Sequence, residues 1–310
     1  MKKSISLVTL IVLLLSVMVG ANAAAVTTDR EGNPITLPET IERIACFGPS
    51  NTEILCAMGV TDKLVAVDTY SFNVEGIAAD LPMFDMMAPD AEKILALNPD
   101  VLFVTGMSKV GGDDPYKPMK DAGVCVIYMP SSSSLNGIKE DIAYIASVVG
   151  ETEKGDEVVA KMEDDIAAIK AIADTAPETK TIYFEISAAP YMYSFGSGVF
   201  LNEMIELINC VNIFADKAEF SGWISVTDEV VLGANPDVIM TSVNYLPDAV
   251  GEIKGRPGWD ALEAVKNDQV FYIDTDSSNR PSQNIIKAFL EMAQAVYPEL
   301  YQDVDLQKAS

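Results

Sequence analysis

Two similar ten-residue segments constrain the fold of this chain more than any other feature. LALNPDVLFV occupies residues 95–104, and LGANPDVIMT occupies residues 232–241. In each segment the end of a helical pattern is followed by Asn-Pro-Asp and then by an apolar run. Because a residue before proline avoids the α region, the helix should end at the asparagine, and the apolar run predicts a buried strand. The sequence therefore predicts the same helix–strand unit twice.

Short apolar runs alternate with helical patterns on both sides of a stretch, residues 135–175, that lacks any strand signal. Before this stretch, Ser50 and Glu53 match the pattern of a capping box, which predicts that a helix starts there between two apolar runs, and further runs follow at 100–106 and 123–129. Beyond it, the alternation resumes from residue 181 to residue 297. This order is typical of parallel βαβ units with right-handed crossovers.

The stretch between the halves predicts a long, charge-rich helix, because Val158, Met162 and Ile166 recur at helical spacing. Interruptions are expected only near Gly150 and Gly155. We therefore predict an α/β fold of two Rossmann-like lobes with mostly parallel central sheets, joined by a single long helix. The predicted division is a signal peptide at 1–23, an N-terminal lobe at 24–140, a linker-helix region at 141–175 and a C-terminal lobe at 176–310.

The first residues have the features of a secretory signal peptide. Two lysines precede an apolar run at residues 5–19, and Ala21-Asn22-Ala23 is a small-residue cleavage signal. The run is shorter than the roughly 20 residues of a membrane span, and we expect no span in the mature protein. Ala21 stands where a lipoprotein would have its cysteine. The sequence therefore predicts an exported protein, periplasmic or at the cell surface, without a lipobox cysteine.

Composition argues against several functional classes. Histidine is absent, and the 46 acidic residues outnumber the 21 basic ones. An acidic surface disfavours nucleic acid, because phosphate binding needs a basic footprint. Without histidine the usual zinc sites and His-based triads are excluded, and neither a G-x-x-x-x-G-K-[ST] nor a G-x-S-x-G motif occurs. We expect no catalytic residues, no metal site and no cofactor, and therefore not an enzyme.

The four cysteines lie in apolar runs, where a free thiol behaves as a small hydrophobic side chain. Export would permit disulfides. We favour four free thiols, with Cys46 and Cys125 as the pair to check first. The cysteines are Cys46, Cys56, Cys125 and Cys210.

The opening segment RIACFGPSNTEILCAMGVTDKLVAVDTY, residues 43–70, resembles the class III substrate-binding proteins of ABC importers, the cobalamin and ferric-siderophore group. The two repeated units and PGWDALEAVKNDQVFYID, residues 257–274, share the resemblance. It implies two α/β lobes bridged by one rigid helix, which as a stiff hinge should permit only small lobe movement on binding, and a ligand cleft between the lobes. It also implies a partner, an ABC permease dimer with its ATPase subunits. We expect a monomer.

Aromatic and methionine side chains are concentrated in loops that follow predicted strands. In open α/β sheets, ligands bind outside the carboxyl ends of the strands, and such side chains offer flat apolar surface to a large ligand. The alternative is that these side chains pack under their own loops. The candidate ligand-binding residues of this kind are Tyr70, Phe72, Phe84, Met86, Tyr191, Tyr193 and Trp223.

The family resemblance adds roles for single residues. Trp223 and Tyr70 align with ligand-stacking aromatics of cobalamin binders, whereas Met86 replaces another such aromatic. Arg280 occupies the place of a cleft arginine and could meet a carboxylate or catecholate oxygen; its alternative role is a surface charge beside a helix. Lys109 and Lys117, in a glycine-rich loop, are weaker candidates for added positive charge.

These observations lead to an extracytoplasmic substrate-binding protein that captures an iron chelate, either a siderophore or haem, for an ABC importer. Cobalamin is the alternative ligand. Haem would need a Tyr, Met or Cys axial ligand, for which Tyr70 or Tyr193 could serve. Remote alternatives are an enzyme or a surface sensor on the same scaffold.

Each repeated unit has a glutamate seven residues before its proline, Glu92 and Glu229. A carboxylate in the first turn of a helix is stabilised by the helix dipole, which is a sufficient structural explanation. The family resemblance implies a second role, in which the paired glutamates dock onto basic pockets of the two permease subunits.

Overall fold

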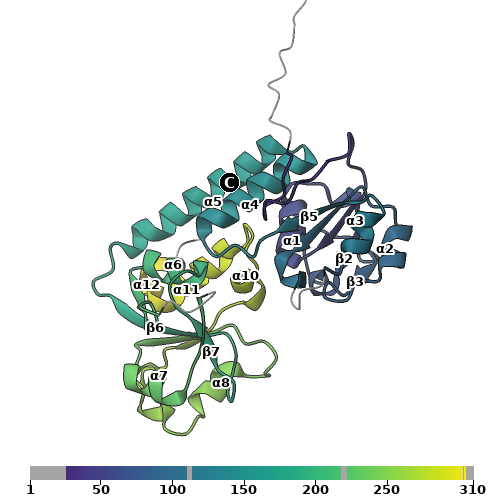
Figure 1. Ribbon diagram of the computed structural model, residues 1–310. Helices are drawn as coiled ribbons and strands as arrows, with labels where there is room; N and C mark the ends of the chain where they lie inside the picture. Colours follow the sequence, from purple (N-terminus) through teal and green to yellow (C-terminus); the bar gives the residue numbers. More distant parts are fainter. Residues whose placement is uncertain (1–25, 110–113, 218–221, 303, 305–310) are drawn as a thin grey trace, which may run out of the picture.

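The computed structural model describes residues 26–109, 114–217, 222–302 and 304, so the predicted signal peptide lies outside the described residues. Two separate parallel sheets form the centres of two lobes, and a pair of long helices extends along both (Figure 1). The predicted fold class is confirmed. The lobe boundaries at residues 140 and 175 stay a prediction.

The first sheet has the strand order β3-β2-β1-β4-β5, and all of its neighbouring strands are parallel. Helices α1, α2 and α3 lie in its crossovers. The strands are β1 (Ile44–Phe47), β2 (Leu64–Asp68), β3 (Met83–Phe84), β4 (Val101–Thr105) and β5 (Cys125–Met129); the helices are α1 (Pro49–Ala57), α2 (Ala91–Ala96) and α3 (Lys117–Asp121).

The second sheet has the order β11-β10-β6-β8 and is also parallel. Its strands are β6 (Lys180–Glu185), β8 (Cys210–Asn212), β10 (Val238–Thr241) and β11 (Val270–Tyr272). A separate antiparallel ribbon pairs β7 (Tyr193–Phe195) with β9 (Trp223–Ser225). The helices of the second lobe are α6 (Phe200–Leu207), α7 (Asp228–Ala234), α8 (Ala249–Lys254), α9 (Glu263–Lys266), α10 (Thr275–Asn279), α11 (Ile285–Val296) and α12 (Pro298–Tyr301).

The repeated units adopt the same conformation in both lobes. Asn98 and Asn235 each have φ 47°, the left-handed conformation that ends a helix. The aspartate that follows then ties its strand to the first strand of the lobe. Asp100 Oδ2 accepts from the Arg43 N–H at 2.8 Å, and Asp237 Oδ2 accepts from the Thr181 N–H at 2.8 Å. The Asn-Pro-Asp sequence thus both ends the helix and aligns the strand.

Strand β8 and the ribbon were not expected from the sequence. The helical pattern of residues 200–210 continues to Cys210, but Asn209 adopts φ 56°, so α6 ends before it and Cys210 starts an edge strand instead. The ribbon lies where the sequence suggested only loops.

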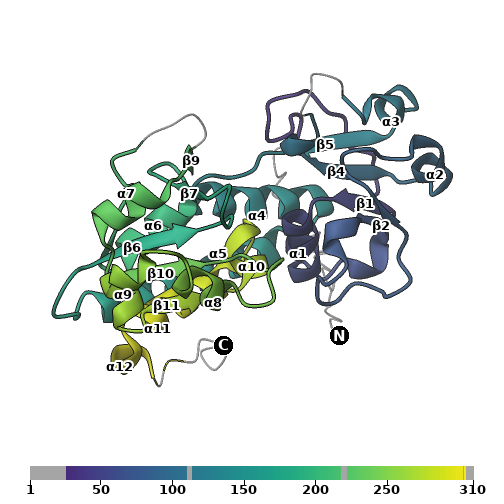
Figure 2. The ribbon, with the colours of Figure 1, turned by 90° about the horizontal axis from the view of Figure 1, so that it is seen from below.

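The predicted linker is a helical hairpin. Helix α4 (Leu135–Val149) packs on α1 of the first lobe and ends at Gly150, which has φ 81°. Helix α5 (Thr152–Ala173) then runs unbroken through Gly155 and packs on α11 and α12 of the second lobe. Figure 2 shows α4 and α5 lying side by side between the lobes. The break therefore lies at Gly150 alone.

All four cysteines are free thiols. Cys46 lies on β1 and Cys125 on β5, with β4 between these two strands, so the pair is not bridged. Burial raises the pKa of the Cys46 thiol, which keeps it protonated.

At Gly155, α5 lies so close to α4 that a Cβ built there would overlap Ala146 Cβ. We predict that Gly155→Ala lowers the free energy of unfolding by about 1–3 kcal/mol, since the helices must separate. Gly233→Ala is the matched control, because a Cβ on this glycine of α7 meets no atom within 4 Å. Urea unfolding checks the difference; equal midpoints for the two variants would contradict it.

Candidate functional site

The strand order of each sheet defines where a ligand surface is expected. The order reverses between β1 and β4 in the first sheet, and between β6 and β10 in the second. Ligands of open α/β sheets bind outside the carboxyl ends of strands at such points. Segments that follow the neighbouring strands β2 and β11 contact each other across the lobes, because Arg280, after β11, donates to the carbonyl of Tyr70, after β2.

The loop after β2 presents two aromatic side chains to solvent. Tyr70 is 58% exposed and Phe72 is 68% exposed. The fully buried carboxylate of Asp68 shapes this loop, because it accepts from the N–H of Tyr70 and the hydroxyl of Ser71 at 2.8 and 2.6 Å. It also accepts from the N–H of Gly48 at 2.9 Å, which joins the loop to the end of β1. The aromatics are therefore held outward by a buried polar anchor.

Strand β3 and the loop after it expose other residues than the sequence predicted. Met86 is buried in the core beside the sheet, and Phe84 is half-buried with its ring centroid 5.8 Å from that of Phe47. Met83 and Met87 are the exposed apolar side chains of this segment. Met86 is thus placed against the sheet, and Met87 offers the free thioether.

In the second lobe the ribbon carries the predicted aromatics. Tyr193 and Trp223 lie on the same face of β7–β9 and are both exposed. The Trp223 ring stands edge-on to buried Phe195, with centroids 6.3 Å apart. Tyr191, in the loop before β7, is 77% exposed. These three side chains form an apolar surface at the carboxyl side of β6.

Three further exposed side chains at carboxyl ends of strands were missed by the sequence analysis. Met107 follows β4, Tyr245 follows β10 and Tyr272 ends β11. The Tyr245 hydroxyl accepts from the Ala188 N–H at 2.8 Å, so it also supports the loop that carries Tyr191. Applying the carboxyl-end rule to every strand would have identified all three.

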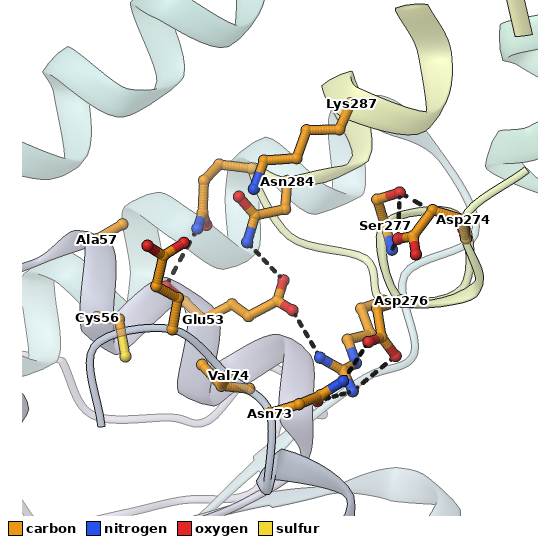
Figure 3. A pocket seen from close by; sticks show the side chains of 13 residues that line it. Glu53, Cys56, Ala57, Asn73, Val74, Asp274, Asp276, Ser277, Asn284 and Lys287 are labelled. Atoms are coloured by element: carbon orange, nitrogen blue, oxygen red, sulfur yellow. Dashed lines mark hydrogen bonds and ion pairs between the residues drawn. The ribbon is translucent and has the colours of Figure 1, made fainter. Parts of the chain in front are cut away.

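Arg280 joins the two lobes. Its guanidinium donates to Glu53 Oε1 at 3.1 Å, to Asn73 Oδ1 at 2.8 Å and to the Tyr70 carbonyl at 3.0 Å, all from the first lobe. Asp276, on α10 of its own lobe, lies 2.8 Å away. Glu53, Asn73, Asp276 and Arg280 line a polar pocket of about 350 Å³ between the lobes. Figure 3 shows Glu53, Asn73 and Asp276 around this pocket. A ligand contact by Arg280 stays a prediction; in this structure its partners are protein groups.

Glu53, on α1, is the centre of the same contact on the first-lobe side. Its Oε2 accepts from the Ser282 hydroxyl and from Asn284 Nδ2, and its carbonyl accepts from Gln283 Nε2 at 3.1 Å. The Glu53 side chain is almost fully buried. We call this set of bonds around Glu53 and Arg280 the interlobe bridge.

Other sites have little support within the described residues. No group of three or more acidic or cysteine side chains there could hold a metal ion. No helix of that part of the chain is both long and apolar enough to cross a membrane. Lys117 forms an ion pair with Asp121 at 2.5 Å, and the Lys109 side chain lies outside the description.

Glu92 and Glu229 occupy equivalent exposed positions at the starts of α2 and α7. These helices lie at opposite ends of the molecule in both ribbon views. The backbone N–H of Glu229 and the Thr227 hydroxyl lower the pKa of the Glu229 carboxyl. Glu229 therefore has a local role at its helix terminus whatever else it contacts.

The periplasmic binding protein family matches residues 44–277 of the chain. A relative from Bacillus subtilis, the uncharacterized ABC transporter substrate-binding lipoprotein YvrC, is 32% identical over 89% of this chain and 86% of its own length. The molybdate-binding protein MolA of Haemophilus influenzae is 28% identical over 96% of this chain and 91% of its own.

Solved structures of similar proteins share the fold. A possible iron-binding, periplasmic solute-binding protein from Staphylococcus epidermidis superposes with a TM-score of 0.75 at 26% identity, over 84% of this chain and all of the other. The periplasmic vitamin B12-binding protein BtuF of Vibrio cholerae has a TM-score of 0.67 at 27% identity, over 85% of this chain and 99% of the other.

The interlobe bridge should contribute to stability cooperatively. We predict that Arg280→Met lowers the free energy of unfolding by about 3 kcal/mol, because it leaves the buried Glu53 carboxylate without its cation. The double variant Glu53→Gln, Arg280→Met should lose less than the sum of the two single variants. Calorimetry of the four proteins measures this coupling, and strictly additive losses would show that the two side chains act independently.

Proposed function

The chain belongs to the periplasmic binding protein family, the substrate-binding proteins of ABC transporters, and we propose that it captures a bulky metal chelate outside the cytoplasm for import. The observation that carries this proposal is the exposure of aromatic side chains from both lobes at the carboxyl ends of the strands. Tyr70 comes from the first lobe, and Tyr191, Tyr193 and Trp223 come from the second. Flat, rigid rings of this kind suit a ligand with a large apolar surface.

The charges near this surface narrow the ligand class. Arg280 and Arg256, the two buried arginines of the second lobe, are both paired with carboxylates. A multiply charged anion needs cationic or N–H partners, because a buried unpaired charge is costly. A ferric hydroxamate, whose metal centre carries no net negative charge, therefore suits the site better than a catecholate or a small oxyanion. We propose a ferric siderophore of this type as the ligand.

Two related ligands remain alternatives. Haem would require an axial ligand from the protein, and Tyr70 or Tyr193 is exposed and could supply it. Cobalamin is the stronger alternative, because it is also large and amphipathic, and because the similar Vibrio cholerae protein is a vitamin B12-binding protein. Two remote alternatives on this scaffold are an enzyme, which a turnover assay would reveal, and a surface sensor.

Delivery requires a docking surface on each lobe, and we propose Glu92 and Glu229 for it. The two carboxylates are exposed and symmetrically placed at the starts of α2 and α7, one per lobe. Exposed charges of this kind set docking orientation and association rate. The partner is an ABC permease dimer with its ATPase subunits.

Ligand binding tests the function directly. We predict that ferrioxamine B binds the purified protein and quenches the fluorescence of Trp223. Trp259 is fully buried, so the change in fluorescence reports on Trp223. Trp223→Ala and Tyr70→Ala should each weaken binding by about 1–3 kcal/mol. Binding of the Trp223 variant is measured by titration calorimetry. Val211→Ala, exposed on edge strand β8, is the control and should bind normally. Cyanocobalamin binding alone would favour the alternative, and no binding of either chelate or haem would reject the proposal.

Docking is tested by charge reversal. We predict that Glu92→Lys with Glu229→Lys leaves ligand affinity unchanged but sharply lowers permease-stimulated ATP hydrolysis in proteoliposomes, with an effect that weakens at high salt. The control reverses the exposed Asp156 and Asp164 of α5, giving the same net charge. Full stimulation by the glutamate variant would leave these residues only their helix-terminal role.

A further inference from the structure

Arg256 is a buried cation whose position is not explained by the fold alone. It follows α8, is 7% exposed, and makes a two-bond fork to Glu185, with Nη1 2.7 Å from Oε2 and Nη2 2.8 Å from Oε1. Nε donates to Glu252 at 3.0 Å, and the guanidinium lies 4.5 Å from the centroid of the Trp259 ring. The Arg256 guanidinium is thus fixed by its contacts with Glu185, Glu252 and Trp259.

The main partner, Glu185, is the last residue of β6, at the point where the strand order of the second sheet reverses. It is 1% exposed, and burial raises the pKa of its carboxyl although Arg256 opposes this. The Tyr183 hydroxyl also donates to it at 3.1 Å. A buried ion pair contributes little net stability compared with apolar packing. The Arg256–Glu185 pair matters here because it fixes the positions of neighbouring side chains.

Met192, which lies between Tyr191 and Tyr193, is a direct neighbour of Arg256. Arg256 Nη1 lies 3.1 Å from Met192 Sδ, and the Met192 carbonyl accepts from the Val226 N–H at 2.9 Å. Met192 is buried, whereas Tyr191 and Tyr193 on either side are exposed. One inward side chain therefore anchors the two outward tyrosines, and the same residue joins them to the segment after β9.

The network continues to α7. The Trp259 indole N–H donates to Asp228 Oδ1 at 2.9 Å, and the same ring lies against the Arg256 guanidinium. Asp228 is the first residue of α7 and immediately precedes Glu229. A continuous path of contacts thus leads from the start of α7 through Trp259 and Arg256 to Met192.

We propose that Arg256 is a positioning residue, which holds the loop of Tyr191 and Tyr193 in its ligand-facing shape and links that loop to the start of α7. Arg256 touches no ligand itself; it acts through Met192. This inference rests on the proposed function for the ligand and the docking helix.

The first test needs no ligand. Arg256→Lys keeps a positive charge beside Glu185 but loses the fork and the contact with Met192. We expect amide hydrogen exchange in residues 186–195 and 223–227 of the unliganded protein to rise at least tenfold. Arg30→Lys is the matched control, because Arg30 is an ion-paired arginine of the other lobe, 2.7 Å from Asp141. It should leave both segments as protected as in the parent protein.

Two further variants test the contact with Met192 and the bond to Asp228 separately. Met192→Ala keeps the Arg256–Glu185 pair but removes the anchor, and should release residues 186–195 in the same way. Trp259→Phe keeps a ring under the guanidinium but deletes the bond to Asp228, and should speed exchange only at residues 228–234. Unchanged exchange at 186–195 in both Arg256→Lys and Met192→Ala overturns the proposal. If Arg256→Lys does not fold, Met192→Ala decides the matter.

A ligand measurement completes the test. With ferrioxamine B as the probe, we expect Arg256→Lys to raise Kd about tenfold, and Arg30→Lys to leave it unchanged. Faster exchange without any change in Kd would overturn the role in ligand positioning. If the parent protein binds neither ferrioxamine B, haem nor cyanocobalamin, the proposed function fails. The exchange comparison still decides whether Arg256 holds the loop.

Discussion

The interlobe bridge is the contact on which the candidate site depends. Glu53 and Arg280 are buried against each other, and Arg280 also holds the carbonyl of Tyr70. The same guanidinium therefore joins the lobes and holds the backbone of Tyr70, one of the proposed ligand-binding aromatics. An ion pair in a low-dielectric setting is strong only when its geometry is good, so a small displacement of either lobe weakens it.

Both lobes use the same strategy to display apolar rings, which is to anchor them from beneath with buried polar groups. In the first lobe the carboxylate of Asp68 organises the loop of Tyr70 and Phe72. In the second, Arg256 and Glu185 lie beneath the loop of Tyr191. The polar groups keep these apolar side chains in solvent, where a ligand can bury them.

Periodic features of the sequence predicted most of the fold. The repeated Asn-Pro-Asp units gave both helix ends, because Asn98 and Asn235 meet the same local requirement wherever the rest of the chain lies. Features that depend on distant contacts were not predictable. Met86 is buried and Met87 exposed because a single step along the loop reverses the side a residue faces. The first-lobe partners of Arg280 lie more than 200 positions away, so the sequence offered a cleft arginine, by family resemblance, or a surface charge, and not the bridge that the structure has.

The α4–α5 hairpin has a consequence for how ligands are discriminated. Helix α5 is 22 residues long, roughly 33 Å at 1.5 Å per residue, and has no break where it passes between the lobes. An intact helix resists bending far more than a pair of extended segments, so we expect the spacing of the two aromatic surfaces to change little when a ligand binds. We propose that this spacing selects ligands by size, because a molecule too small to reach both lobes would contact only one of them.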